Sequence, residues 1–214
     1  MASLGNSEST NYNKTQTTEG GAVSLFQYFR LVPFNASAKS TRDTAPALAV
    51  DISGILVSQD SSLSVSYQIT APSNTVKHTT PNPHPSRKND LWRTTCFELF
   101  AKPFTGTEYW EYNLAPSGDW NAYRFTAYRS ELQAEEQISD IAIETEIANS
   151  TLVGLKAVLP LPTALVGQKL AIGITCVIED TAGNMHYFAL HHPGAKPDFH
   201  DPAGFVLTFD PASA

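Results

Sequence analysis

Acidic, amide and guanidinium side chains alternate with aromatic rings along residues 90–129, a segment that also contains all three tryptophans of the chain. The polar residues include Glu98, Glu111, Asn113 and Arg124. Charged groups cost free energy on a buried face unless they are paired, so either a bound ligand or a salt-bridge network must account for them. A sugar would use both kinds of group, because aromatic faces stack on its C–H surface while polar groups bind its hydroxyls.

Strand alternation decides which of these side chains can meet. In the sequence YWEYNL, Glu111 and Asn113 share one face of an expected strand, and Glu98 lies on one face of the strand before it. If the register brings these faces together, Glu98, Glu111, Asn113 and Arg124 form a polar cluster flanked by aromatic rings. The alternative is an internal Arg–Glu ion-pair network that fixes the strand register and binds nothing. Both interpretations stay open at this stage.

Six residues are therefore candidates for ligand binding, with roles set by their chemistry. Trp92 or Trp120 would stack on the ligand, although either could instead pack the core. Asn113 and Arg124 would donate hydrogen bonds to hydroxyl groups, and Glu98 and Glu111 would accept them. The same two carboxyl groups could in principle act as acid and base on a glycosidic bond, which is a third hypothesis.

Two other groups of reactive side chains are less specific. PSGDW predicts a turn and not a catalytic serine, because it lacks the G-x-S-x-G pattern of a nucleophile elbow. His191, Asp198 and His200 are weak candidates for a metal site, since their spacing matches no zinc signature and a proline-punctuated surface loop explains them equally. The two cysteines, Cys96 and Cys176, lie in apolar, strand-like surroundings and are expected to be buried thiols, although a disulfide between them is the alternative.

The elements that must position these residues are predicted to be strands. Eleven segments are rich in β-branched and aromatic residues, and several alternate apolar with polar residues: 24–32, 47–57, 63–70, 92–102, 107–115, 122–129, 138–147, 151–160, 169–179, 185–190 and 204–209. Turn-forming residues separate most of them. We expect an all-β, antiparallel β-sandwich of jelly-roll or immunoglobulin-like type with about ten or eleven strands. Only residues 130–137 have a composition that suits one or two helical turns.

Length and composition limit the other possibilities. The chain of 214 residues is long enough for one domain, which we place at 23–214, after a polar tail at 1–22 that is expected to be disordered or loosely packed. The net charge of -7 and the lack of a basic cluster argue against a nucleic-acid or anionic-membrane partner. Neither a signal-peptide pattern nor a long apolar run is present, so we expect a cytoplasmic location and no membrane association.

The central pattern resembles a known family. Trp92, the CFELF segment with Glu98, YNLAPSGDW and AYRFTAYR together resemble the bacterial DOMON-like family, which is related to family-nine carbohydrate-binding modules. The later segment HHPGAKPDFHDPAGFVLTF is similar to the ending typical of that group. The resemblance covers about a third of the chain. It implies a β-sandwich that holds a small ligand, either a sugar or a haem, and it implies no catalytic reaction.

We therefore predict a non-catalytic module that binds a carbohydrate or a sugar-like metabolite. The first alternative is haem, which DOMON-type domains hold through a Met and a His. Met185 and His186 are adjacent and cannot both ligate one iron from opposite sides, so His191 or His78 would have to supply the second ligand. The second alternative is a structural or protein-interaction sandwich with an internal ion-pair network. A structural calcium ion, held by carboxylates and carbonyls as in the related modules, is also compatible with the sequence.

Overall fold

The computed structural model describes residues 13–17, 23–34, 48–59, 61–77, 79–149 and 151–210. Within these ranges the chain forms strands and two short 3-10 helices, and no α-helix. The elements are β1 (Asn13–Thr17), β2 (Val23–Pro33), β3 (Asp51–Gln59), β4 (Ser62–Thr70), η1 (Leu91–Arg93), β5 (Cys96–Pro103), β6 (Tyr109–Leu114), β7 (Trp120–Phe125), β8 (Gln133–Ala134), β9 (Ile143–Ala148), β10 (Thr151–Pro160), β11 (Leu170–Glu179), β12 (Met185–Ala189), η2 (Pro202–Gly204) and β13 (Leu207–Phe209).

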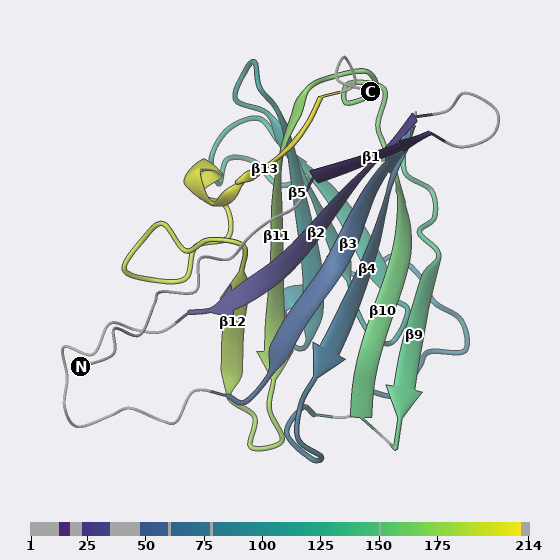
Figure 1. The fold of residues 1–214 in the computed structure, drawn as a ribbon, viewed down its shortest axis with the longest axis vertical. Coiled ribbons are helices and arrows are strands. Elements are labelled where there is room, and N and C mark those ends of the chain that lie inside the picture. Colours follow the sequence, from purple (N-terminus) through teal and green to yellow (C-terminus); the bar gives the residue numbers. More distant parts are fainter. Residues whose placement is uncertain are drawn as a thin grey trace.

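Eleven of the strands form one curled antiparallel sheet, a half-barrel, in the order β8-β7-β6-β5-β11-β12-β2-β3-β4-β10-β9 (Figure 1). The two remaining strands lie beside this path, β1 on β2 and β13 on β11. The predicted all-β antiparallel class is confirmed. A division into two separate sandwich sheets is not confirmed, because β12 and β2 pair at Phe188–Pro33 and Ala189–Val32 and so join the two halves.

The main core lies between the two halves of the curled sheet. On β4 the residues Leu63, Val65, Tyr67 and Ile69 are buried, while the residues between them are more exposed, as period-two alternation predicts. The Tyr67 ring lies 4.7 Å from the Phe97 ring of β5, centroid to centroid, so the two halves touch across this core. Each such fully buried side chain contributes roughly 1.5–3 kcal/mol to folding.

A second apolar cluster covers the opposite face of β5, β6, β7 and β11. Its buried members are Phe100, Tyr109, Tyr123, Phe125 and Phe205. Phe205 belongs to the C-terminal segment, and its ring stacks on that of Phe100 with centroids 5.4 Å apart. A side chain at position 173 would clash here, because a Cβ on the glycine would lie 2.5 Å from the Phe205 ring. The C-terminal segment is thereby held against this face of the sheet.

The helical turns expected at 130–137 do not form. Gln133 and Ala134 make the short edge strand β8, which pairs with β7. The backbone N–H of Glu135 donates to the Ala122 carbonyl, and its side chain accepts a hydrogen bond from the buried Trp110 indole at 2.7 Å. A buried indole N–H needs an acceptor, and meeting that need at the sheet edge outweighs the helix-favouring composition of the segment.

Several other predictions concern the periphery. Of the expected N-terminal tail, residues 13–17 form β1, and 1–12 and 18–22 lie outside the described residues. Cys96 and Cys176 are buried free thiols, as expected, and the register places them on opposite faces of neighbouring strands, since Cys176 opposes Phe97. The described residues include no helix that is long and apolar enough to cross a membrane.

Candidate ligand-binding site

The strand register brings three of the six candidate residues onto one face. Glu98 of β5 lies opposite Asn113 of β6 and opposite Thr175 of β11, while Glu111 of β6 lies opposite Phe100. Residues that oppose each other across antiparallel strands point to the same side of the sheet. We call this side, which carries Glu98, Glu111, Asn113, Thr175 and, from β12, Tyr187, the site face. It is the side away from the main core.

Arg124 and Trp120 do not join this set, which corrects the sequence-based expectation. Arg124 opposes Trp110, a main-core residue, so it points away from Glu111. Its guanidinium donates to Glu108 Oε1 at 2.5 Å and lies 5.7 Å from the centroid of the Trp110 ring. Trp120 is buried in the main core. The error arose because a shift of one residue along a strand reverses the face, and Tyr123, not Arg124, opposes Glu111.

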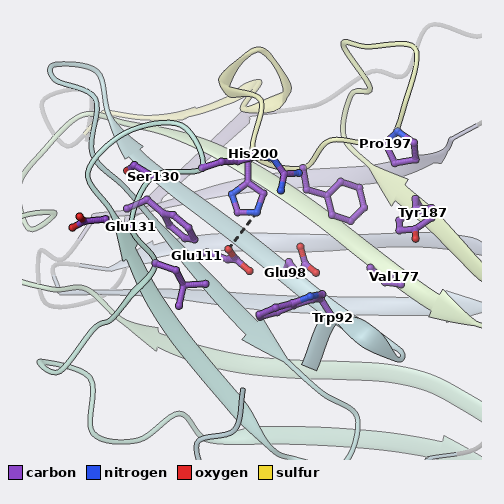
Figure 2. A pocket seen from close by; sticks show the side chains of 13 residues that line it. Trp92, Glu98, Glu111, Ser130, Glu131, Val177, Tyr187, Pro197 and His200 are labelled. Atoms are coloured by element: carbon purple, nitrogen blue, oxygen red, sulfur yellow. Dashed lines mark ion pairs between the residues drawn. The ribbon is translucent and has the colours of Figure 1, made fainter. Parts of the chain in front are cut away.

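A pocket of about 470 Å³ opens onto the site face (Figure 2). Glu98 and Glu111 form its floor, and Trp92 of η1 lies beside them as one wall. Tyr187, Pro197 and Phe199 form another part of the wall. His200 lies over the carboxyl groups and forms the roof of the pocket. The residues that line the pocket are Trp92, Glu98, Glu111, Phe125, Arg129, Ser130, Glu131, Leu132, Val177, Tyr187, Pro197, Phe199 and His200.

His200 is held over the floor by polar and aromatic contacts. Its Nδ1 atom is 2.8 Å from the hydroxyl of Tyr109, and its Nε2 atom is 3.7 Å from Glu111 Oε2. The rings of Phe100 and Phe125 meet the imidazole edge to face, with centroids 5.3 and 5.1 Å away. These contacts fix the imidazole in one position, so the roof of the pocket has a defined shape.

Asp198 joins the two loops that cover the pocket. One of its oxygens accepts a hydrogen bond from Arg129 at 2.8 Å and another from the backbone N–H of His200 at 3.2 Å. Its second oxygen accepts from the Tyr128 hydroxyl at 2.5 Å. The loop after β7 and the C-terminal segment are thus tied together at the pocket rim. The charge of Arg129 is balanced within this contact.

Trp92 is placed by the loop that precedes it. The Arg87 guanidinium donates to Asn121 Oδ1 at 3.0 Å and to the carbonyls of Ala122, Glu135 and Ile138. This binds the loop to β7 before the chain enters η1. The Trp92 ring then meets the Tyr123 ring edge to face at 6.0 Å and remains half-buried, with part of its surface facing the pocket.

Burial dominates the electrostatics of the floor. Glu98 and Glu111 are 3% and 4% exposed. Burial, together with the charge of Glu111, raises the pKa of Glu98 well above its usual value against the opposing hydrogen bond from Thr175. Burial also raises the pKa of Glu111 to about 7, although a hydrogen bond from Asn113 and the charge of Arg129 both lower it.

The overlying imidazole is shifted in the opposite sense. Burial lowers the pKa of His200 to about 4, with a smaller contribution from the charge of Arg129. His200 is therefore neutral at pH 7, and it does not supply a positive charge to the carboxyl groups beneath it. Within the part of the chain that the structure describes, no Lys or Arg forms an ion pair with Glu98 or Glu111.

Among the residues described, those considered for metal and haem do not form a cluster of ligands. His191 is exposed, whereas Asp198 and His200 are engaged in the pocket roof. His186 pairs with Asp180 at 2.9 Å. Among the residues described, no three His, Cys, Asp or Glu side chains are arranged to hold a metal ion. His78, the other haem candidate, lies outside the described residues.

Sequence reasoning missed several residues of the pocket. Tyr187 alternates onto the site face from β12, and Phe199 reaches the pocket from the C-terminal segment. Arg129 is the last residue of the segment 90–129, but the local sequence pattern assigns it no role. His200 was considered only as a metal ligand. Each of these residues comes from a loop or strand far from Glu98 in the sequence.

Comparison with known proteins identifies a protein with the same fold but assigns the chain to no family. No family model matches the sequence, and no curated protein matches it. Among solved structures, a Bacteroides uniformis protein, described provisionally as carbohydrate-binding, superposes with a TM-score of 0.56 at 12% identity, covering 83% of each chain. A family-nine carbohydrate-binding module from Caldicellulosiruptor kristjanssonii, bound to cellotriose, has a TM-score of 0.38 at 12% identity, covering 75% of this chain and 71% of its own. The chain thus shares the fold of the first protein, while its resemblance to the DOMON-like family stays a prediction.

Proposed function

We propose that this protein is a non-catalytic module that binds a carbohydrate in the pocket on the site face. One observation carries the proposal: Glu98 and Glu111 are almost fully buried at the pocket floor, yet each has an oxygen without a hydrogen bond from the described residues. These two oxygens open onto the pocket, where a polar ligand can replace water as their hydrogen-bond partner, so the arrangement favours a ligand with hydroxyl or other donor groups.

The rest of the pocket matches the two surfaces of a sugar. The half-buried face of Trp92 and the rings of Tyr187 and Phe199 offer apolar surface for the C–H side of a pyranose. The carboxyl groups of Glu98 and Glu111 face the hydroxyl groups, and the protonated form of Glu98 can donate as well as accept. The volume of about 470 Å³ lies within the range of small-molecule sites.

The comparison with solved structures is consistent with this proposal. The Bacteroides uniformis protein with the shared fold is described as carbohydrate-binding, provisionally. Proteins that share a fold can differ in function, so the proposal depends on the geometry of the pocket and not on this likeness. The structural alternative, an Arg–Glu network on the site face, is not favoured, because Arg124 pairs with Glu108 on the other side of the strand.

The test is calorimetric titration of the purified protein with a panel of neutral mono- and oligosaccharides. At least one sugar should bind, and Trp92→Ala and Glu98→Gln should each weaken it by about tenfold or more. Arg124→Met is the matched control, since it removes a polar side chain of the same segment from the opposite face and should leave affinity unchanged. Loss of binding in Arg124→Met with normal binding in Glu98→Gln would contradict the assignment of the site, and the absence of any sugar binding would contradict the function.

A further inference from the structure

The pocket floor carries two acidic groups and no cation among the residues described. Thr175 donates to Glu98 Oε2 at 3.2 Å and Asn113 donates to Glu111 Oε1 at 2.6 Å, which leaves one oxygen of each carboxyl group facing the pocket. Both side chains are more than nine-tenths buried. Each carboxyl group therefore directs one oxygen that accepts no hydrogen bond from the described residues into the cavity (Figure 2).

The nearby basic side chains compensate these acidic groups only in part, since the charge of Arg129 lowers the pKa of Glu111 without forming an ion pair with it. Arg129 lines the same pocket, but its guanidinium donates to Asp198 at 2.8 Å. The imidazole of His200 lies 3.7 Å from Glu111 and hydrogen-bonds to Tyr109 through its other nitrogen. Glu131 adds a further acidic group to the lining. The acceptor-rich floor is therefore left for the ligand to balance.

The two buried acidic groups favour a positively charged group on the ligand. A buried carboxylate is costly unless it is paired with a positive charge, and a cation that enters the pocket provides that partner. A protonated amine is compact and has three N–H donors, which suits two acidic oxygens that lie on neighbouring strands. The face of Trp92 beside the floor adds cation–π attraction for the same group.

From this geometry we propose that the ligand is a cationic sugar, namely an amino sugar whose protonated amine is bound between Glu98 and Glu111 while its ring packs on Trp92. The inference rests on the proposed function and narrows its ligand class. An N-acetylated or fully neutral sugar would present a hydroxyl or an amide to the same oxygens and would leave the carboxyl groups without a counter-charge.

A proton should leave the pocket when such a ligand binds. Burial keeps the pKa of Glu98 well above its usual value and that of Glu111 at about 7, so part of the floor is protonated at pH 7 before binding. A cation beside these groups favours their ionised forms and lowers both pKa values. The other ionisable groups on the site face and in the pocket lining are Cys96, Tyr109, Tyr123, Arg129, Glu131, Tyr187, Asp198 and His200. Among these, Arg129 carries a positive charge that already lowers the pKa of Glu111, but burial outweighs it and holds that pKa at about 7.

The experiment compares ligands that differ at one substituent. Glucosamine, galactosamine and mannosamine are each titrated beside their N-acetylated and parent sugars at pH 7, in two buffers with different ionisation enthalpies. We expect at least one amino sugar to bind about tenfold or more tightly than both of its neutral counterparts. Its apparent enthalpy should differ between the buffers, which reports proton release, and that of the neutral sugars should not.

A variant pair locates the effect. Glu111→Gln should lower the affinity for the amino sugar about tenfold and remove the preference over the neutral sugars, while the exposed control Glu136→Gln should keep both. Thermal melts of each variant show that loss of binding does not come from unfolding.

Three results would overturn the inference in distinguishable ways. Neutral sugars that bind as tightly as the amino sugars would remove the cationic preference and leave the proposed function standing. Ethanolamine that binds as tightly as any amino sugar, with no binding of neutral sugars, would show a simple amine site and would contradict the proposed function too. If no member of the three sets binds, the inference is wrong, and the broader neutral panel decides the proposed function separately.

Discussion

Replacement of Glu111 by glutamine should make the protein more stable above neutral pH. The substitution keeps the size of the side chain and the acceptor oxygen that binds Asn113 at 2.6 Å, but it removes the ionisable group. A pKa of about 7 in the folded state compares with 4.5 as the ordinary value for a glutamate. The difference corresponds to about 3 kcal/mol of destabilisation once the carboxyl group is ionised.

The sign follows from proton binding. Between pH 4.5 and about 7 the folded state binds more protons at Glu111 than the unfolded state does, so the contribution of this group to stability falls as pH rises through that window. It is constant above it. Glu111→Gln should therefore match the wild type near pH 4.5 and exceed it by up to about 3 kcal/mol at pH 8.

The assay is urea unfolding followed by tryptophan fluorescence at pH 4.5, 6, 7 and 8 for the wild type, Glu111→Gln and the exposed control Glu136→Gln. The control should follow the wild type throughout. A difference that grows with pH in favour of Glu111→Gln is the expected result. If Glu111→Gln is less stable than the wild type at pH 8, the carboxylate has a compensating partner, and the account of an unsatisfied pocket floor is refuted.

Three further predictions concern other parts of the site. Burial lowers the pKa of His200 to about 4, so the contribution of His200 to stability should fall by about 2.5 kcal/mol between pH 6.5 and 4. His200→Gln should therefore show a shallower fall in stability than the wild type in the same urea experiment, and equal slopes would contradict this. Trp120→Ala should lower the free energy of unfolding by about 3–5 kcal/mol because it leaves a cavity in the main core. Trp92→Ala should lower it by less than about 2 kcal/mol because Trp92 is only half-buried. A larger loss for Trp92→Ala than for Trp120→Ala would contradict the positions of these two residues. Arg124→Met should change stability by less than about 1 kcal/mol, since both partners of its ion pair are about 40% exposed, and a larger loss in thermal melts would indicate a structural ion-pair network.

Local sequence patterns predicted eleven of the strands and the sharing of faces within them, but neither β1 nor β8. Period-two alternation in YWEYNL places Glu111 and Asn113 together, and the structure has them on the site face with Glu98. The positions of turns between strands also follow from local residues, such as Gly118 in the left-handed turn before β7. These features depend on neighbours a few residues apart, which is why one sequence is enough to predict them.

Register and loop closure could not be predicted in this way. Arg124 is one residue away from a position on the site face, and only pairing between β6 and β7 reveals the difference. The roof of the pocket depends on contacts between residues 69 to 91 positions apart, such as Asp198 with Arg129 and His200 with Tyr109. Nothing in the local sequence of either partner indicates such contacts.

The most direct test of the binding site uses the three tryptophans as reporters in ¹⁵N-resolved NMR, with indole signals assigned from single Trp→Phe variants. Trp92 lines the pocket, whereas Trp110 and Trp120 are buried in the main core on the other side of the sheet. Titration with a sugar that binds should shift the Trp92 indole signal progressively and leave those of Trp110 and Trp120 nearly unchanged. A bound sugar that shifts the two core indoles, or residues of β2 and β10, while the Trp92 signal stays fixed would contradict the proposed site.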